Sequence, residues 1–186
     1  MKISIITVCY NSASTIRDTL ESVLSQTYQD IEYIVIDGAS KDSTLAIISE
    51  YEGRISTVLS EPDKGIYDAM NKGIKLATGD YVGILNSDDV FSSTSTIEDL
   101  VKFLEANPAC DASYANLVFV QRDNTDVVTR KYSSSGFSTW KIRFGFMIPH
   151  PTFYARRSLF DQFGYYKLGY RVSADFELMT RFITQG

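Results

Sequence analysis

Short apolar runs alternate with amphipathic segments along the first half of the chain. Residues 3–8 form a β-branched run, which is typical of a strand buried on both faces. The next apolar residues recur at the spacing of one helical face: Ile16, Leu20, Val23 and Leu24. Continued along the chain, the pattern predicts strands at Ile3–Val8, Ile31–Ile36, Ile55–Leu59 and Tyr81–Leu85. It predicts helices at 16–24, Thr44–Tyr51, Ile66–Ala77 and Thr96–Glu105.

Strands that alternate with helices indicate right-handed crossovers and a parallel sheet. We therefore expect an α/β fold with a mostly parallel central sheet flanked by helices. In the second half, Ala112–Val120 and Thr125–Tyr132 predict a strand pair in a smaller mixed sheet, and Ala174–Thr184 predicts a final helix. Because no repeat or low-complexity linker interrupts the chain, we predict one domain over residues 1–186, with halves at 1–110 and 111–186.

A polar cluster follows each of the four predicted strands. The clusters are Tyr10-Asn11, residues 37–42, residues 61–65 and residues 86–89. The carboxyl ends of parallel strands meet at one edge of the sheet, where such folds bind ligands. One cluster could be a simple polar turn, but four of them together predict a binding site.

Three Asp residues carry most of this prediction. Asp88 and Asp89 supply oxygens that suit Mg²⁺ or Mn²⁺, which commonly bind one or two carboxylates together with substrate phosphates. The alternative for Asp89 is a cap at the start of the following helix. Asp37 ends a very apolar strand, so its carboxylate needs a specific partner. That partner is either a ligand or the Ser40 or Lys41 N–H in a local turn.

Three further residues each have a functional and a structural interpretation. Tyr10 could stack on a planar ring or simply pack against the protein. Lys64, before Gly65 at a predicted helix start, could hold phosphate or be an exposed loop lysine. His150, the only histidine, lies between two prolines, and we expect it to support the structure or another site residue rather than act as a catalytic base.

Composition excludes several classes of protein. The chain has 186 residues, 44% of them hydrophobic, with 18 basic and 23 acidic side chains and a net charge of −5. These values are typical of a globular protein and argue against a nucleic-acid binder, which is usually basic. The charge is uneven, because residues 130–186 hold 9 basic and 3 acidic side chains, a net +6. That basic third is either a face for phosphate or a membrane, or an ordinary solvated face.

The remaining sequence features narrow the chemistry and the location. Two cysteines, Cys9 and Cys110, form neither a zinc motif nor a disulfide framework. Neither G-x-G-x-x-G nor G-x-x-x-x-G-K-[ST] occurs, so dinucleotide and P-loop sites of those kinds are not expected. No apolar run is long enough to span a bilayer. We therefore expect a cytoplasmic protein, with the inner face of the membrane as the alternative location.

Taken together, the motifs resemble those of the family 2 glycosyltransferases of GT-A fold. The resemblance rests on five segments over residues 3–90: Thr7 to Asn11, Asp37 to Thr44, Asp63 to Gly73, Gly79 to Tyr81 and Leu85 to Asp89. His150 to Tyr154 and Ser173 to Leu178 match more loosely. Two positions depart from the family pattern: Asn86 stands where many relatives have Asp, and Ala174 stands where they have Glu.

The resemblance implies a role for each candidate residue. Asp37 contacts the nucleotide base, and Tyr10 lines the base pocket with Thr7 beside it. Asp88 and Asp89 hold Mg²⁺ or Mn²⁺ on the sugar-nucleotide diphosphate. The expected donor-binding residues are Thr7, Tyr10, Asn11, Asp37, Lys64 and Asp68. Asp175 is the expected general base, although it is also placed to be a cap or first-turn acid of the last helix.

The implied activity is metal-dependent, inverting transfer of a sugar from a nucleotide-diphosphate donor to a glycan or lipid-linked acceptor. Bacterial polysaccharide or lipid-linked glycan assembly is the implied setting, with peripheral membrane association and homo-oligomers as further expectations. The aromatic and basic stretch Phe137–Phe146 is then either an acceptor or membrane edge, or a loop packed on the core.

Two other functions remain open. One is a non-catalytic nucleotide-sugar-binding module, because the chain ends at Gly186, soon after Asp175, and we expect the acceptor side to be incomplete. The other is a sugar nucleotidyltransferase. That class is expected to have a Gly-rich, Arg-containing loop near the N-terminus, which residues 7–14 lack.

Overall fold

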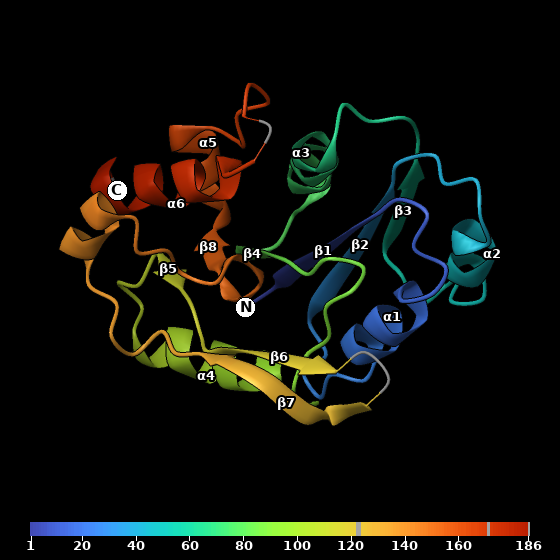
Figure 1. Ribbon diagram of the computed structural model, residues 1–186, viewed down its shortest axis with the longest axis horizontal. Helices are drawn as coiled ribbons and strands as arrows, with labels where there is room; N and C mark the ends of the chain where they lie inside the picture. The colour runs from blue at the N-terminus through green and yellow to red at the C-terminus, as the bar shows by residue number, and fades with distance from the viewer. Residues whose placement is uncertain (122–123, 171, 186) are drawn as a thin grey trace.

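The computed structural model describes residues 1–121, 124–170 and 172–185 (Figure 1). Gly186, the last residue of the predicted domain, lies outside the described residues. The strands are β1 (Ile3–Cys9), β2 (Ile31–Asp37), β3 (Thr57–Ser60), β4 (Tyr81–Ile84), β5 (Ala112–Ser113), β6 (Leu117–Gln121), β7 (Asn124–Tyr132) and β8 (Tyr154–Arg156). The α-helices are α1 (Ile16–Leu24), α2 (Thr44–Ser49), α3 (Ile66–Leu76), α4 (Thr96–Ala106), α5 (Arg157–Phe163) and α6 (Ala174–Gln185). Two 3₁₀ helices, η1 (Thr139–Phe144) and η2 (His150–Thr152), complete the described elements.

Six strands form the central sheet in the order β3-β2-β1-β4-β8-β5. The first four are parallel, whereas β8 runs antiparallel to both of its neighbours. β6 and β7 form a separate antiparallel pair, which agrees with the pairing expected from the sequence. The expected α/β architecture, with a mostly parallel centre and a smaller second sheet, is confirmed.

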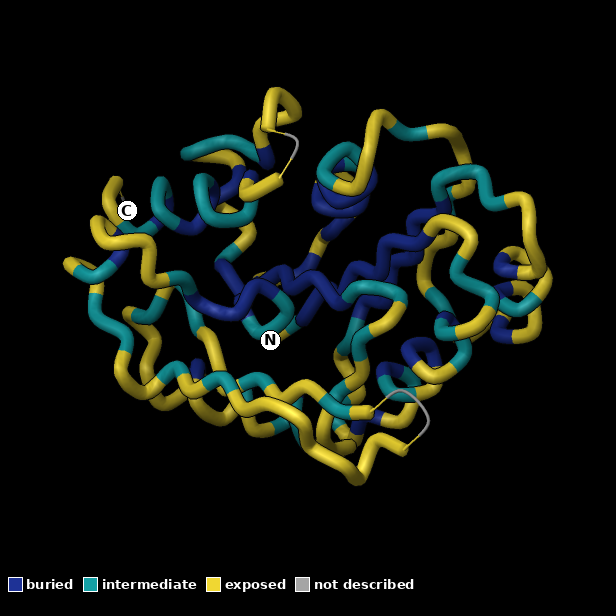
Figure 2. The backbone as a smooth tube through the Cα atoms, viewed as in Figure 1, coloured by how far each residue is buried: buried dark blue, intermediate teal, exposed yellow. Residues whose placement is uncertain are grey.

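Helices cover both faces of the central sheet. α3, α5 and α6 pack on one face, where Ile6, Ile34 and Ile36 point toward them, and α1, α2 and α4 pack on the other (Figure 1). Along β1 and β2, successive side chains therefore enter opposite core clusters, and both clusters exclude water. This explains why these strands are continuously apolar. In Figure 2 they form the buried centre of the molecule, while the β6–β7 hairpin is largely exposed.

The strand register brings the carboxyl ends of β1, β2 and β3 into line. Cys9 pairs with Asp37, and Asp37 pairs with Ser60. Two backbone bonds extend this alignment into the loops: Gly38 N–H donates to the Cys9 carbonyl and Glu61 N–H to the Asp37 carbonyl, at 2.9 and 3.0 Å. Residues that are far apart in sequence consequently leave the sheet side by side.

Some predicted elements were wrong in extent. β3 starts at Thr57 rather than Ile55. Ile55 packs against the core from the segment before the strand, so its apolar side chain does not mark a strand position. The predicted strand at 112–120 is divided into β5, which joins the central sheet, and β6, which joins the hairpin. β8 and α5 were missed. β8 is a strand of only three residues, and short strands that depend on tertiary pairing give little local signal.

Within the described ranges, none of the helices combines the length and the apolar character needed to cross a bilayer.

Candidate active site

Hydrogen bonds join the loops that follow β1, β2 and β4. Asn11 N–H donates to the Ser40 hydroxyl, and the Asn11 side-chain oxygen accepts from Lys41 N–H, both at 2.8 Å. On the other side, the hydroxyls of Ser12 and Ser87 are 2.9 Å apart. The loop after β1 therefore bridges the Asp37 loop and the Asp88–Asp89 turn, so the structure brings together the clusters that the sequence predicted.

Two residues in these loops adopt left-handed backbone conformations. Asn11 has φ 50° and Ala39 has φ 62°. Asn tolerates this region, but for Ala it costs roughly 1–2 kcal/mol. Such strain concentrates where a fold holds a loop in a particular shape for function.

Asp37 is completely buried, and hydroxyl and amide donors surround its carboxylate. Ser40 donates both its N–H, at 3.0 Å, and its hydroxyl, and Ser60 donates its hydroxyl at 2.7 Å. The local turn left open by the sequence is therefore present, together with a further partner from β3. The Cys9 thiol also faces Asp37, and burial first, then this carboxylate, raises the pKa of Cys9 far above its usual range. Cys9 thus behaves as a buried hydrophobe, as expected.

Tyr10 lies at the mouth of this site. More than half of it (58%) is exposed, which argues against simple core packing. Beside it, a Cβ on Gly38 would lie 2.5 Å from Asp63 Oδ2 and 3.4 Å from the Tyr10 ring, so a side chain there would have to displace the Asp63 carboxylate. Asp63 in turn accepts a hydrogen bond from Gly65 N–H at 2.8 Å. Tyr10, Gly38 and the Asp63 loop therefore form one closely packed wall.

Thr7 does not lie where the sequence placed it. The residue is fully buried, and its hydroxyl is 3.0 Å from the Tyr33 hydroxyl inside the core. Thr7 points into the sheet face covered by α1 and α2, because the side chains of a strand alternate between the two faces. The expectation that Thr7 lines the binding pocket does not agree with this position, so Thr7 is corrected to a core residue.

Lys64 and Asp68 lie at the start of α3. The Asp68 carboxylate accepts a hydrogen bond from Lys64 N–H at 2.9 Å and is 4.0 Å from Lys72 Nζ, so it ties the loop before α3 to the first turn of the helix. The Lys64 side chain itself is exposed. It lines a cavity of about 320 Å³ between the start of α3 and residues 168–170, with Tyr67 in the same wall.

The Asp88–Asp89 turn presents one exposed and one half-buried carboxylate. Burial first, and then the Asp88 charge, raises the pKa of Asp89, while a 3.2 Å hydrogen bond from Asn86 acts in the opposite direction. Asp89 caps no helix, because α4 begins at Thr96 with Ser95 at its cap. The structural alternative for Asp89 is therefore wrong.

The donor set at this turn is compatible with a divalent cation but incomplete by itself. In the described part of the chain, no three His, Cys, Asp or Glu side chains are grouped as metal ligands. The buried Asn86 Oδ1 has no hydrogen-bond partner among these residues. An unpaired amide oxygen beside two carboxylates suits Mg²⁺ or Mn²⁺, whose other ligands are commonly phosphate and water oxygens.

Asp175 lies in the first turn of α6, as predicted. Its Oδ1 accepts a hydrogen bond of 3.2 Å from the Tyr67 hydroxyl, which comes from α3. Ser173, just before the helix, has φ 70° and so turns the chain sharply into it. This position suits both a first-turn acid of α6 and a general base.

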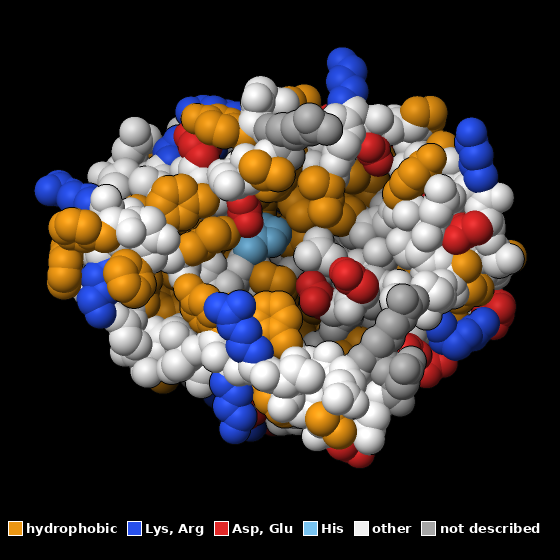
Figure 3. Space-filling model, viewed as in Figure 1, with side chains coloured by type: hydrophobic (Ala, Val, Ile, Leu, Met, Phe, Trp, Pro, Cys, Tyr) orange, Lys and Arg blue, Asp and Glu red, His pale blue; other side chains and the backbone are white. Residues whose placement is uncertain are grey.

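His150 is a supporting residue, in agreement with the sequence expectation. It is 9% exposed, and its Nε2 is 2.7 Å from the Tyr166 hydroxyl. Burial lowers the pKa of His150, and the Asp175 charge opposes that shift. Figure 3 shows this only histidine at the base of a hollow, with Asp or Glu side chains on both sides.

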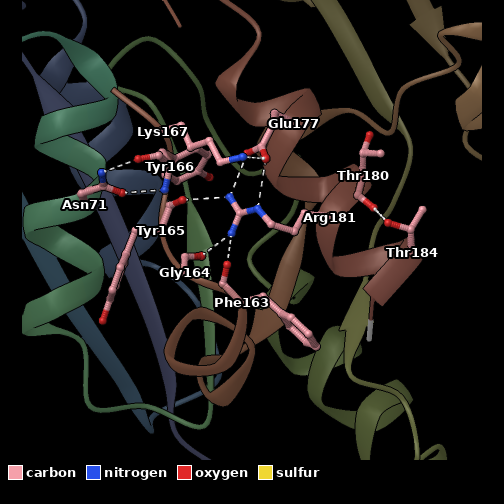
Figure 4. Close-up of polar contacts among 10 residues, drawn as sticks. All are labelled: Asn71, Phe163, Gly164, Tyr165, Tyr166, Lys167, Glu177, Thr180, Arg181 and Thr184. Carbon is pink, nitrogen blue, oxygen red and sulfur yellow. Dashed lines mark hydrogen bonds and ion pairs between the residues drawn. The ribbon is translucent and has the colours of Figure 1, made fainter. Parts of the chain in front are cut away.

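Sequence reasoning missed the residues that hold the Asp175 side of the hollow. Asn71 exchanges two hydrogen bonds with the Tyr166 backbone, at 2.8 and 2.9 Å (Figure 4). Arg181 binds Glu177 and donates to the carbonyls of residues 163–165 (Figure 4). The i,i+4 spacing of Glu177 and Arg181 on the last helix was the one available signal.

Comparison with known protein sequences gives consistent matches over most of the chain. A family model described as glycosyl transferase family 2 matches residues 4–164. A PGL/p-HBAD biosynthesis glycosyltransferase of Mycobacterium bovis is 32% identical over 184 residues, which cover 96% of this chain and 68% of the relative. A UDP-Glc:alpha-D-GlcNAc-diphosphoundecaprenol beta-1,3-glucosyltransferase of Escherichia coli is 32% identical over 187 residues, which cover 99% of this chain and 71% of the relative.

Solved structures share the fold. S. aureus TarS 1-349 in complex with UDP-GlcNAc superposes with a TM-score of 0.81 at 23% identity, over 97% of this chain and 53% of that one. The mannosyltransferase PcManGT from Pyrobaculum calidifontis, in complex with GDP-Man and Mn²⁺, gives 0.74 at 21% identity, over 100% and 52%. This chain thus spans about half the length of these solved chains.

Proposed function

The chain belongs to glycosyl transferase family 2, and on this premise we propose that it moves a sugar from a nucleotide-diphosphate donor to an acceptor hydroxyl, with inversion at the anomeric carbon. One observation carries the proposal. The loops after β1, β2 and β4, which hold the donor-side candidates, are hydrogen-bonded to one another. Asp175 stands apart from them at the start of α6, beside the histidine in the hollow.

The donor nucleotide occupies the edge formed by these loops. Tyr10 offers an exposed ring for stacking on the base, and Asp37 offers a buried carboxylate to a base N–H. Ser40 and Ser60 hold that carboxylate in place. Asn11 fixes the Asp37 loop, because its side-chain oxygen accepts a hydrogen bond from Lys41 N–H, and its side-chain NH2 is offered to the donor.

Asp88, Asp89 and the Asn86 amide oxygen are the residues that would hold Mg²⁺ or Mn²⁺. Such an ion neutralises charge on the diphosphate leaving group. The Mn²⁺ in the complex of the Pyrobaculum calidifontis mannosyltransferase, a protein of the same fold, supports this assignment. Lys64 adds a positive charge on the cavity side of the site.

Asp175 acts as the general base. Its carboxylate takes the proton from the acceptor hydroxyl while the oxygen attacks the anomeric carbon and the bond to the diphosphate breaks. One base and one direct displacement produce inversion and need no enzyme carboxylate bonded to the sugar. The hydrogen bond from Tyr67, a residue that lines the cavity at the start of α3, supports this role for Asp175.

The acceptor is lipid-linked, and the acceptor side rests on the inner face of an anionic membrane. The E. coli relative, whose acceptor is a diphosphoundecaprenol, supports the acceptor class. Trp140, Phe144 and Phe146 are 60%, 72% and 57% exposed, and Lys141 lies over two of these rings. Residues 127–160 contain no Asp or Glu. Aromatic side chains mixed with basic ones, without acids, suit an anionic lipid interface.

The decisive experiment measures melting temperatures with UDP-, GDP-, dTDP- and CDP-sugars, with and without Mn²⁺, followed by product analysis. We expect at least one nucleotide to stabilise the protein only with metal, and Asp88→Ala with Asp89→Ala to abolish that shift. Asp175→Asn should keep the shift and lose transfer. Stabilisation that ignores the metal would contradict the site.

The products separate the alternatives. A glycosyltransferase releases nucleoside diphosphate, a sugar nucleotidyltransferase releases pyrophosphate, and a binding module releases neither.

A further inference from the structure

Tyr67 connects Asp175 to a buried tyrosine–histidine pair. The Tyr67 hydroxyl donates to Asp175 Oδ1 at 3.2 Å. The Tyr67 ring stacks on Tyr166, with centroids 5.6 Å apart and planes at 24°. Tyr166 in turn meets His150 through the 2.7 Å contact between its hydroxyl and Nε2. Four side chains from four segments of the chain thus form one continuous series of contacts that ends at the proposed base.

The inner end of this series is rigidly held. Tyr166 and His150 are 4% and 9% exposed. The side chain of Asn71, one turn after Tyr67 on α3, binds both backbone groups of Tyr166. Arg181 holds the three residues before Tyr166 by their carbonyls (Figure 4). The ring on which Tyr67 stacks is therefore fixed relative to both α3 and α6.

The outer side of Tyr67 faces open space. Tyr67 lines the 320 Å³ cavity together with Lys64, Gly65, Ile66 and residues 168–170. Its hydroxyl engages only one oxygen of Asp175, and no donor among the described residues is placed on Oδ2. The Asp175 carboxylate therefore has one oxygen held by Tyr67 and one oxygen available.

We propose that Tyr67 is a positioning residue for the transfer reaction: it fixes the carboxylate of Asp175 through Oδ1 and leaves Oδ2 to the acceptor hydroxyl. This inference rests on the proposed function, in which Asp175 is the base. Tyr67 acts through Asp175 and does not exchange a proton with the substrate. Fixing the rotamer of a base matters because small misplacements of a reacting group reduce rates strongly.

The charges around Asp175 are consistent with this role. Burial first, and then the Asp175 charge and its hydrogen bond, raises the pKa of Tyr67, while the N–H groups of Ala174 and Asp175 act in the opposite direction. Tyr67 therefore remains a hydrogen-bond donor at neutral pH. Burial raises the pKa of Tyr166 and lowers that of His150, so both stay neutral. On α6 itself, Glu177 is paired with Lys167 and Arg181.

The test variant is Tyr67→Phe, which removes the hydroxyl and keeps the stacked ring. Transfer is followed by release of nucleoside diphosphate, with undecaprenyl-diphosphate-linked GlcNAc or water as acceptor. We expect kcat to fall roughly tenfold while the donor KM and the nucleotide-induced melting shift stay unchanged. The acid limb of the pH–rate profile should move to higher pH, because a hydrogen bond to a carboxylate favours its charged form. A purely structural role would not move that limb.

Two further variants make the result interpretable. Tyr165→Phe is the matched control. It removes the hydroxyl from a ring that stacks on Phe160, in the residue before Tyr166, and it should behave as wild type. Tyr67→Leu also removes the stacking and should lower the melting temperature, which Tyr67→Phe should not. Wild-type kcat and pH profile in Tyr67→Phe, with Asp175→Asn inactive, would overturn the positioning role. Activity in Asp175→Asn would instead overturn the proposed base.

Discussion

Glu32 allows a stability prediction whose size follows from the structure. The residue lies near the start of β2, with its side chain 10% exposed. Its carboxylate accepts hydrogen bonds from the Ser4 hydroxyl at 2.5 Å, from Thr78 N–H and hydroxyl at 2.7 and 2.6 Å, and from Lys2 Nζ at 3.1 Å. These bonds join β2 to β1 and to the loop before β4. Replacing Glu32 with Gln removes the charge and disrupts part of this set.

The magnitude follows from the pKa of Glu32. Burial alone raises this pKa, but the bonds from Ser4, Thr78 and Lys2 outweigh it and lower the pKa from its ordinary 4.5 to about 2. A carboxyl whose pKa is lower in the folded state stabilises the protein above its unfolded-state pKa. This contribution is about 3 kcal/mol above pH 5 and declines as the pH falls from 4.5 toward 2. By pH 3.5 roughly 1 kcal/mol of it is lost.

Urea unfolding followed by circular dichroism at pH 7, 5 and 3.5 tests this reasoning. The difference in unfolding free energy between wild type and Glu32→Gln should shrink by roughly 1 kcal/mol between pH 7 and pH 3.5. Glu105→Gln, an isosteric change at an exposed position of α4, should differ from wild type by less than about 0.5 kcal/mol. A difference between Glu32→Gln and wild type that is the same at all three pH values would refute the assignment.

Two other predictions concern the donor and membrane surfaces. Gly38→Ala places a methyl group 2.5 Å from Asp63 Oδ2 and so displaces that carboxylate. The nucleotide that shifts the melting temperature should then bind a few-fold more weakly by calorimetry. Gly136→Ala, with no atom within 4 Å of the new methyl, is the control, and equal affinities in both variants would contradict the packing argument. Trp140→Ala with Phe144→Ala should reduce co-sedimentation with phosphatidylglycerol vesicles several-fold, whereas Phe103→Ala, at an exposed position of α4, should not. Equal binding by all three proteins, or none by wild type, would contradict the membrane surface.

The sequence was sufficient for the architecture of the first half. Continuous apolar runs appear only where helices cover both faces of a strand, so the strands around Ile6 and Ile34 could be recognised locally. The strand ends could be located in the same way, since Asp37 and Asn86 interrupt apolar runs. Parallel pairing then required the polar clusters to share one edge, and the register of Cys9, Asp37 and Ser60 agrees with that.

Only the tertiary structure decided which of these side chains face a ligand. Thr7 belongs to the same motif as Tyr10, yet its side chain is buried against Tyr33. Successive side chains of a strand point to opposite faces, so the position within the motif decides which of them reach a ligand. The contact between Tyr67 and Asp175 joins residues 108 positions apart, and it depends on how α3 packs beside α6. Local patterns determine which residues are buried, whereas partners across the fold are determined by packing.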